Sequence, residues 1–375
     1  MTGPETPAGA AGRVARLSAE LKEREVDVLL VASAVDLRYL SGFTGSNGLA
    51  LVAGKGEGWE IGSSRFFTDF RYATQSAEQL YGGFEREIVA GELLDAAARA
   101  LPAQGGRLGF DDATVTVAQH ARLREHLPEQ WELVPFAGAV ERMRAVKDAD
   151  ECARLRAAAA LADEALRGVL EAGVVGRSER DVAIELELFM RRLGAEAASF
   201  PSIVAAGAHA ALPHAEPRAV PIPRDVLLTI DWGAQLEGYC SDCTRTYATG
   251  ERISAQAREV YELVLSAQLA ALAAVRAGPS GRELDGVARA VIERAGHGQD
   301  FGHGLGHGVG LEVHEGPRLS RIAGEEPLRV GNVVSIEPGV YLPERLGVRI
   351  EDVVIVGAAE SENLSSLPKG LTVVA

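Results

Sequence analysis

Residues 302–315, GHGLGHGVGLEVHE, hold three of the eight histidines of the chain and a glycine at every second position from Gly302 to Gly310. Glycine permits a positive φ and lets the backbone approach a bound group closely. The stretch is therefore a poor candidate for a routine helix or core strand. Neutral imidazole is a common metal ligand and general base, so the stretch predicts a chemical site rather than a flexible turn that happens to hold histidines.

Two well-known motifs do not fit this stretch. The dinucleotide fingerprint G-x-G-x-x-G fails because the third residue after Gly304 is His307, and the zinc motif H-E-x-x-H fails because the third residue after Glu315 is Arg318.

The composition is that of an ordinary globular protein of 375 residues, long enough for two domains. A net charge of −15 argues against nucleic acid and anionic membranes as partners. The longest uncharged apolar stretch, 263–275, is too short to span a bilayer. Residues 1–12 lack the basic start and apolar core of a secretory signal, so a frayed tail is expected there.

The three cysteines are an odd number, which favours a reducing cytoplasm over a disulfide framework. Cys240 and Cys243 form a C-x-x-C, but 239–248 is predicted to be one strand, on which residues three apart face opposite ways. We therefore interpret the pair as incidental. Cys152, at the start of a helix, is expected to serve packing.

The first part of the chain alternates short apolar runs with amphipathic stretches, which indicates an α/β domain. The expected helices are 13–25, 93–100 and 117–126, and the expected strands are 28–31, 49–52 and 108–110, with 66–72 read as a strand leading into a helix capped by Asp69. Residues 134–146 are expected to cross to a second domain. We place the domains at 1–140 and 141–375.

The second part has the character of an α+β domain. Its expected helices are 151–170, 178–193 with Ser178 as N-cap and Asp181 in a capping-box position, 252–276 and 281–295. Its expected strands are 202–206, 226–232, 239–248, 332–336 and 347–356.

Four carboxylates lie beside β-branched runs, where burial of an acid is costly: Asp231, Asp242, Glu337 and Glu351. Arg349 alone cannot balance them. A network of ion pairs with scattered arginines is one explanation. Two divalent ions, which would neutralise all four together, are the explanation that we favour.

The expected hairpin 226–248 can aim Asp231 and Asp242 at one point, and one histidine of the glycine-rich stretch would complete the set. Four oxygens and one nitrogen form a hard ligand set, which suits Mn²⁺, Co²⁺ or Fe²⁺ better than a thiolate zinc site would. Paired metals can activate a water, so hydrolysis is the natural chemistry.

These segments resemble the dinuclear aminopeptidase P / prolidase / methionine aminopeptidase superfamily, the pita-bread metallopeptidases. The resemblance lies in five segments in the same order: 230–233 (IDWG), 241–246 (SDCTRT), 302–315, 336–339 (IEPG) and 349–352 (RIED). Residues 69–72 (DFRY) resemble, more weakly, the creatinase-like N-terminal domain. The resemblance implies an α/β creatinase-like domain followed by an α+β pita-bread catalytic domain.

The resemblance also implies roles. The metal ligands would be Asp231, Asp242, His307, Glu337 and Glu351, holding two divalent ions, with Mn²⁺ expected first and Co²⁺, Zn²⁺ or Fe²⁺ as alternatives. Glu337 would also accept a proton. The remaining implied catalytic residues are His214, His303, His314 and Arg349, and the residues that would contact substrate are His214, His314, Arg318 and Tyr341. His120, His126, His209 and His297 match no motif and are interpreted as surface or structural histidines.

Several functions remain open within this resemblance. Creatinase-type members and binding relatives lack the metal ligands that are present here, and methionine aminopeptidases usually lack so large an N-terminal domain. We therefore expect a cytoplasmic, homodimeric Xaa-Pro peptidase acting on proline-containing dipeptides or longer peptides. A methionine aminopeptidase-like enzyme and a non-enzymatic binding protein stay as alternatives. Arg318 could pair with the free carboxylate of a dipeptide, although an ordinary surface or interdomain ion pair is the explanation slightly favoured.

Overall fold

The structure, a computed structural model, describes residues 12–54, 64–81 and 83–374. The chain divides into two compact units, Met1–Arg144 and Ala145–Ala375, called here the N-terminal and C-terminal units. The tail expected to fray, 1–12, lies outside the described residues except for Gly12. Among the residues that are described, no helix combines the length and the apolar character needed to cross a membrane.

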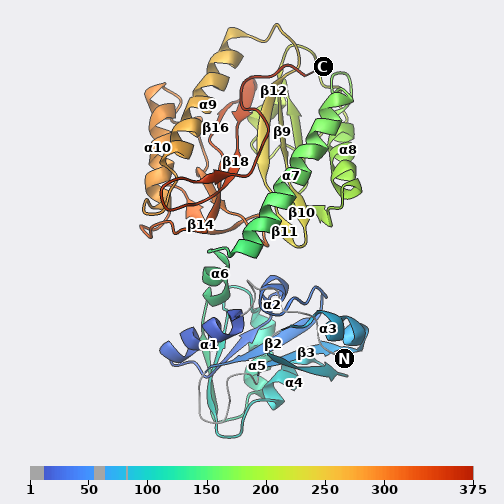
Figure 1. The fold of residues 1–375 in the computed structure, drawn as a ribbon, viewed down its shortest axis with the longest axis vertical. Helices are drawn as coiled ribbons and strands as arrows, with labels where there is room; N and C mark the ends of the chain where they lie inside the picture. Colours follow the sequence, from blue (N-terminus) through green and yellow to red (C-terminus); the bar gives the residue numbers. More distant parts are fainter. Residues whose placement is uncertain (1–11, 55–63, 82, 375) are drawn as a thin grey trace. The chain divides into compact units, whose positions relative to one another are not determined.

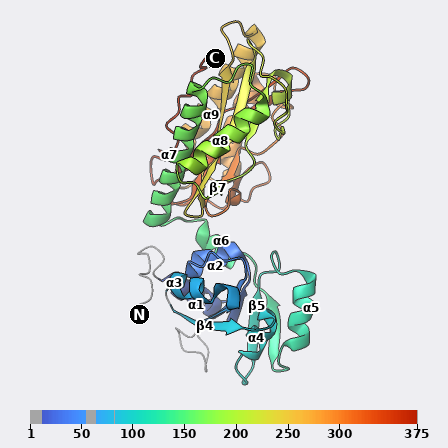
Figure 2. The same ribbon diagram turned by 90° about the vertical axis from the view of Figure 1, so that its right-hand side faces the viewer.

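The N-terminal unit is an α/β fold around a six-stranded sheet of order β4-β3-β2-β1-β5-β6 (Figures 1 and 2). β1 pairs antiparallel with β2 and parallel with β5. Helices α4 and α5 supply alanines and leucines to the core on one face of this sheet. The strands are β1 (Val28–Val31), β2 (Gly48–Ala53), β3 (Ser64–Asp69), β4 (Phe84–Val89), β5 (Gly106–Phe110) and β6 (Trp131–Pro135). The helices are α1 (Arg13–Glu23), α2 (Ala34–Ser41), η1 (Phe70–Tyr72), α3 (Ala73–Gln79), α4 (Leu93–Arg99), α5 (Val117–His126) and α6 (Ala139–Arg144).

Most local predictions for this unit are confirmed, including strand 28–31, helix 117–126 and Asp69 as a cap, whose side chain accepts a hydrogen bond from the Arg71 amide. The segment expected to cross to the second domain, 134–146, does contain the boundary between the two units, after Arg144, and it also holds the end of β6 and all of α6. Helix α2 was not expected. It begins at an N-cap serine, Ser33, which accepts a hydrogen bond from the Asp36 amide.

The C-terminal unit has the expected α+β character. Helices α7 and α8 pack on β8 and β9, and helices α9 and α10 pack on the strands of the C-terminal third (Figure 1). The helices are α7 (Ala149–Glu171), α8 (Glu179–Arg192), η2 (Gly207–Ala211), α9 (Ala255–Ala274) and α10 (Gly281–Arg294). The strands are β7 (Ala197–Ala198), β8 (Ile203–Ala206), β9 (Leu227–Trp232), β10 (Ala234–Leu236), β11 (Tyr239–Cys240), β12 (Cys243–Ala248), β13 (Gly306–Gly308), β14 (Glu315–Leu319), β15 (Val333–Ile336), β16 (Gly339–Leu342), β17 (Leu346–Arg349), β18 (Asp352–Ile355) and β19 (Glu362–Asn363).

Helix starts in this unit follow from side chains that cap the backbone. Asp148 accepts from the Glu151 amide and Glu151 returns the contact, which is a complete capping box. Ser178 caps α8 as expected, but the Asp181 carboxylate accepts from the Ser178 hydroxyl at 2.6 Å. The predicted cap is therefore confirmed, while the reciprocal contact goes to the Ser178 hydroxyl instead of its amide.

Two strands that were expected to be continuous are interrupted. The stretch 239–248 breaks at Ser241 and Asp242, between β11 and β12, and the stretch 347–356 breaks at Ile350 and Glu351, between β17 and β18. The amide of Glu351 donates to the carbonyl of Thr244 at 3.0 Å, which joins the two regions. Asp242 and Glu351, which were expected to lie within continuous strands, therefore both stand at breaks.

The glycine–histidine stretch also departs from expectation, because residues 306–308 form β13, hydrogen-bonded between β14 and β15. A Cβ added at Gly306 would lie 2.0 Å from the Ser335 carbonyl oxygen, and one at Gly308 would lie 2.1 Å from that of Gly316. Glycine weakens most strands, but here it allows neighbouring backbones to approach on both sides of His307.

Candidate metal centre

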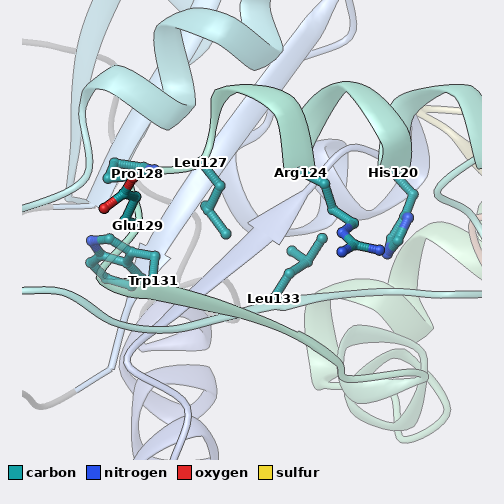
Figure 3. Close-up of a pocket in the computed structure, with 7 residues that line it drawn as sticks. All are labelled: His120, Arg124, Leu127, Pro128, Glu129, Trp131 and Leu133. Carbon is teal, nitrogen blue, oxygen red and sulfur yellow. The ribbon is translucent and has the colours of Figure 1, made fainter.

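A cleft of about 1180 Å³ in the C-terminal unit is lined by ten of the eleven residues predicted for the site. These are His214, Asp231, Asp242, His303, His307, His314, Arg318, Glu337, Arg349 and Glu351. Tyr341 is not among the lining residues. A smaller hollow of about 450 Å³ lies in the N-terminal unit between α5 and β6 (Figure 3). Glu129 is the one carboxylate among the residues that line this hollow, so it offers no comparable ligand set.

The four predicted carboxylates reach the cleft from four different segments. Asp231 lies in β9, opposite Thr244 of β12. Asp242 lies at the break before β12, Glu337 directly after β15 and Glu351 at the break before β18. Each of these positions lies in or beside a buried strand, which explains how acids come to stand in an apolar setting.

His307 brings a nitrogen to these oxygens. Its Nε2 lies 3.2 Å from Glu337 Oε1 and 3.6 Å from Asp242 Oδ2. Its Nδ1 lies 3.0 Å from the Gly308 carbonyl, which can only accept, so Nδ1 carries a proton and Nε2 is the nitrogen that faces the carboxylates. Ligand atoms of Asp242, His307 and Glu351 all lie within 4.8 Å of one another, a spacing that a metal ion can bridge.

Two carboxylate oxygens in this group have no protein partner. Asp231 Oδ2 accepts from Arg349 at 2.6 Å and Glu351 Oε2 accepts from the Thr244 hydroxyl at 2.7 Å. Within the described part of the chain, Asp231 Oδ1 and Glu351 Oε1 are buried without any hydrogen-bond donor. A buried acceptor left without a donor is costly, so these atoms fit the ligand positions of a cation.

The pKa values of these carboxylates reflect the same excess of negative charge. Burial, and then repulsion from Glu351, Asp231 and Glu337, raises the pKa of Asp242 well above its ordinary value. Burial and the neighbouring carboxylates likewise raise the pKa of Glu351 well above its ordinary value. Burial also acts on Glu337, but its hydrogen bond with His307 outweighs this and lowers the pKa of Glu337 to about 2. Leaving several such charges unpaired would cost several kcal/mol for each ion, so a network of ion pairs does not account for the group.

Arg349 connects the carboxylates to the rest of the wall. Besides Asp231, it donates from Nε to the Thr244 hydroxyl at 3.0 Å and from a terminal nitrogen to the Tyr341 hydroxyl at 2.8 Å. The Tyr341 hydroxyl in turn lies 2.9 Å from His303 Nε2, while His303 Nδ1 lies 2.8 Å from the Gly304 carbonyl. Both nitrogens of His303 and the hydroxyl of Tyr341 are thus occupied by protein groups, and Tyr341 stands behind the cleft.

Three predicted residues stand where substrate has access. The ring of His314 lies 4.2 Å from the ring of His307, and burial together with the charge of His307 lowers its pKa. Arg318 is exposed, and no carboxylate in the described residues forms an ion pair with it. His214 is exposed on the segment that follows η2.

The sequence motifs did not reveal the residues that hold the segments of the predicted site in place. The Ser335 hydroxyl accepts from the His307 amide at 3.0 Å and donates to Glu337 at 3.1 Å. Asp285 and Arg289 of α10 form a buried ion pair at 2.7 Å, and Arg289 also donates to the His303 carbonyl at 2.8 Å. The spacing of four residues could have revealed the pair on the helix, but not its contact with a distant loop.

Lys147, at the start of the C-terminal unit, contacts the wall of the cleft beside His314. Its fully buried ammonium group donates to Glu315 at 2.5 Å, and Glu315 directly follows His314. The first residues of this unit therefore help to fix a segment of the cleft wall.

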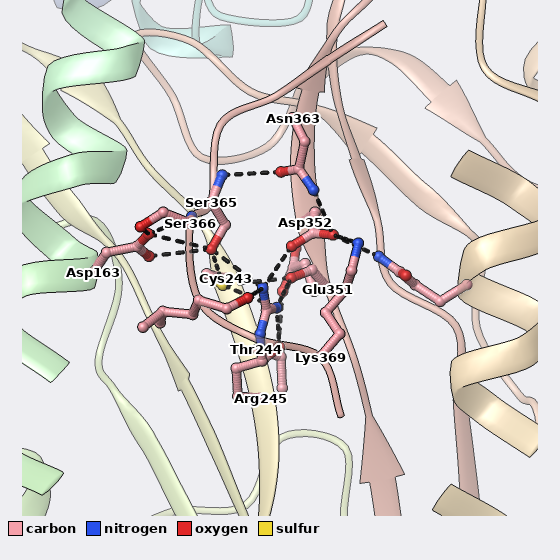
Figure 4. A network of polar contacts seen from close by, with 12 residues as sticks. Asp163, Cys243, Thr244, Arg245, Glu351, Asp352, Asn363, Ser365, Ser366 and Lys369 are labelled. Carbon is pink, nitrogen blue, oxygen red and sulfur yellow. Dashed lines mark hydrogen bonds and ion pairs between the residues drawn. The ribbon is translucent and has the colours of Figure 1, made fainter. Parts of the chain in front are cut away.

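A second buried network lies around Arg245 and Asp352 (Figure 4). Arg245 binds Asp352 at 2.7 Å and also donates to the backbone carbonyl of Glu351. Lys369 and Asn363 donate to the other oxygen of Asp352, at 2.7 and 2.8 Å. Burial acts to raise the pKa of Asp352, but Arg245 and Lys369 outweigh it and lower the pKa. The backbone at Glu351 is thereby fixed by Arg245, which does not line the cleft.

Comparisons with known proteins agree with this geometry. Residues 153–358 match the model of metallopeptidase family M24, and residues 13–146 match that of the creatinase/prolidase N-terminal domain. The chain is 40% identical over 349 residues to the uncharacterized peptidase YqhT of Bacillus subtilis, covering 93% of this chain and 96% of that protein. A solved Xaa-Pro dipeptidase from Bacillus anthracis is 38% identical, covers 97% of this chain and 100% of its own, and superposes with a TM-score of 0.91. A solved X-Pro aminopeptidase from Thermotoga maritima is 33% identical, covers 96% and 100%, and gives a TM-score of 0.85.

The expected creatinase-like and pita-bread fold is confirmed by these matches. Metallopeptidases of this kind depend on divalent metal ions, which the cluster of carboxylates and His307 fits. The chain therefore belongs to metallopeptidase family M24, with a creatinase/prolidase N-terminal domain as its first unit.

Proposed function

We propose that this protein is a dinuclear-metal Xaa-Pro peptidase, which hydrolyses the bond between an N-terminal residue and a following proline. The observation that carries the proposal is the convergence of four carboxylates and His307, with buried oxygens of Asp231 and Glu351 left for a cation. The proline specificity is supported by the solved relatives, which are described as an Xaa-Pro dipeptidase and an X-Pro aminopeptidase.

In this proposal Asp231, Asp242, His307, Glu337 and Glu351 hold two metal ions. When bound, the ions polarise the scissile carbonyl and lower the pKa of a water molecule. Mn²⁺ is proposed as the native metal because the ligands are four carboxylates and one imidazole, with Co²⁺, Zn²⁺ and Fe²⁺ as alternatives to be compared.

The other side chains act on the substrate and on the ligands. Glu337, oriented by the Ser335 hydroxyl, accepts the proton of the attacking water. His314 and His214 orient the peptide and stabilise the oxyanion. Arg349 fixes Asp231, and through Tyr341 it is linked to His303, so we assign His303 and Tyr341 to this supporting chain.

We further propose that Arg318 favours dipeptides, because it is an exposed cation in the cleft without an ion-pair partner among the described residues. A charge-assisted bond to the proline carboxylate contributes about 1.5–3 kcal/mol, or roughly a tenfold to hundredfold preference. Arg318→Ala should lower kcat/KM for Ala-Pro by this factor and spare Ala-Pro-Ala.

Arg321 provides a matched control, since it lines the same cleft but is paired with Glu293 at 3.3 Å. Arg321→Ala should leave the ratio of the two activities unchanged. An equal loss of both activities in Arg318→Ala would remove Arg318 as the determinant and favour an aminopeptidase. Met-Ala-Ala, measured beside these peptides, tests the methionine aminopeptidase alternative, and absence of hydrolysis with every metal would favour a binding protein.

We also propose a homodimer in the cytoplasm. The dimer follows from the family resemblance, and a monomeric mass in light scattering would contradict it. The location is supported by the odd number of cysteines, three, which favours a reducing compartment over a disulfide framework.

A further inference from the structure

The loop that carries His214 is held at both of its ends by one buried carboxylate. This loop, residues 207–218, runs from η2 toward β9, and five of its residues line the cleft: Pro213, His214, Ala215, Glu216 and Pro217. Glu179, the first residue of α8, has a side chain that is only 1% exposed and does not line the cleft.

The contacts of Glu179 divide between the two ends of the loop. At the entry, its carboxylate accepts from the Ala206 amide at 3.0 Å and lies 3.0 Å from His209 Nδ1. At the exit, it accepts from the Arg218 amide at 3.0 Å and from two guanidinium nitrogens of Arg218 at 3.0 and 2.9 Å. One carboxylate thus joins the two ends of the loop, and at the exit the Arg180 amide adds a hydrogen bond to the Arg218 carbonyl at 3.0 Å.

The charge on Glu179 is strongly favoured at this position. Burial acts to raise its pKa, but the hydrogen bonds from Arg218 and from the two backbone amides outweigh burial and lower the pKa. The carboxylate also lies at the start of α8, where the helix dipole stabilises a negative charge. Because it is charged and saturated with donors, Glu179 has little freedom to release either end.

The middle of the loop is attached to the metal centre. Arg349, which binds Asp231, also donates to the Pro213 carbonyl at 3.1 Å, and η2 packs against β17. Ala205, Ala210 and Ala215 form a small buried cluster beneath the loop. A shift at either end of the loop is therefore transmitted to the residue between Pro213 and Ala215, which is His214.

We propose that Glu179, together with His209 and Arg218, is a positioning group that sets the place of His214 in the cleft and thereby supports Xaa-Pro hydrolysis. This inference rests on the proposed function and deepens it, since it assigns a role to residues that touch neither metal nor substrate. The competing explanation is that Glu179 only stabilises the start of α8.

The test compares Glu179→Gln with Glu185→Gln. Glu185 lies on the same helix and forms a partly exposed ion pair with Arg177, so its loss controls for removing an acid from α8. The Glu179→Gln change keeps the size of the side chain but presents an amide group to donors that need an acceptor. A misplacement of about 1 Å can cost on the order of 100-fold in rate, so kcat/KM for Ala-Pro should fall about 10- to 100-fold in Glu179→Gln with metal content unchanged.

A double-mutant cycle separates positioning from stability. If Glu179 acts through His214, adding Glu179→Gln to His214→Ala should cause no further loss of kcat/KM. The proposal would be overturned if the losses of kcat/KM from the two substitutions multiply in the double variant. It would also be overturned if Glu179→Gln lowers the Tm but leaves kcat/KM unchanged. Arg218→Gln, a milder change at an exposed side chain, should show the same pattern if Glu179→Gln fails to fold.

Amide hydrogen exchange gives a readout that does not depend on the reaction. Residues 207–217 should exchange faster in Glu179→Gln than in wild type, and Glu185→Gln should leave them unchanged. If wild type cleaves no Xaa-Pro peptide, the proposed function fails, while faster exchange confined to this loop would still support the positioning role of Glu179. Unchanged exchange would reject that role.

Discussion

Each unit brings three potential metal-binding side chains within 4.8 Å of one another: Asp36, Asp111 and Glu141 in the N-terminal unit, and Asp242, His307 and Glu351 in the C-terminal unit. The negative charge of the N-terminal cluster is offset within the protein, by an ion pair and by a retained proton. Arg144 pairs with Asp36 at 2.9 Å, with both side chains buried. Burial, and then the charge of Asp36, raises the pKa of Glu141 to about 7, so this carboxyl keeps its proton over much of the acidic range.

The C-terminal cluster is not balanced in this way. Arg349 pairs with Asp231, but within the described residues no lysine or arginine forms an ion pair with Asp242, Glu337 or Glu351. It also contains the imidazole of His307, whose Nε2 faces Asp242 and Glu337. The comparison teaches that proximity of carboxylates does not define a metal site, whereas unbalanced charge with unpartnered buried oxygens does.

The largest expected effect comes from removing one acid from each cluster. Asp242→Asn should lose at least one metal ion and bring peptidase activity below detection, because ligand atoms of Asp242, His307 and Glu351 lie within 4.8 Å of one another and a metal ion there needs all three. Asp111→Asn should keep both metal content and activity. Metal analysis by mass spectrometry and hydrolysis of Ala-Pro provide the two readouts. Equal metal loss in both variants would erase the distinction between the clusters.

A smaller effect is expected from a histidine that adjoins the ligands. His314→Ala should retain metal but lower kcat by about 100- to 1000-fold, as the loss of one group that stabilises an oxyanion typically does. Metal analysis and steady-state kinetics on the same preparation check this. Loss of metal in His314→Ala would mean that the ligand set extends beyond the five residues proposed.

The smallest expected effect concerns the proton that Glu141 keeps in the N-terminal carboxylate cluster. Since the folded pKa of Glu141, about 7, lies above the ordinary value of 4.5, its proton stabilises the folded state below that ordinary value. This stabilisation should be lost as pH rises from about 4.5 through about 7. The Tm of Glu141→Gln should therefore fall less between about pH 5 and about pH 8 than that of wild type. Glu125→Gln, at an exposed site on α5, serves as control, and parallel curves for wild type and Glu141→Gln would show that Glu141 carries no extra proton.

Much of the site could be predicted because its chemistry is local in sequence. Asp231 and Glu337 follow apolar runs that do form strands, β9 and β15, so their place at a buried edge follows from pattern alone. Asp242 and Glu351 could be found as acids in costly positions, but their orientation could not. The breaks beside them depend on a contact between Glu351 and Thr244, which are 107 residues apart in sequence.

Contacts between residues distant in sequence also explain the prediction errors elsewhere in the chain. β13 was missed because glycine propensity is unfavourable in an isolated strand, whereas in this sheet the narrow spacing to Ser335 and Gly316 requires it. Helices α2 and α6 are only 8 and 6 residues long, too short to show a clear helical period. Supporting groups such as Glu179 gave no motif, because their partners lie in loops whose course the sequence does not reveal.

The buried pair of Lys147 and Glu315 bears on the order in which the protein can fold. The two residues are 168 positions apart, so during synthesis Lys147 is made long before its carboxylate partner exists. Every strand of the N-terminal sheet, by contrast, lies between Val28 and Pro135 and has its neighbours available before Lys147 emerges. Domains generally fold as units during synthesis, the N-terminal one first. The wall of the cleft beside His314 therefore closes late, when most of the chain has already left the ribosome.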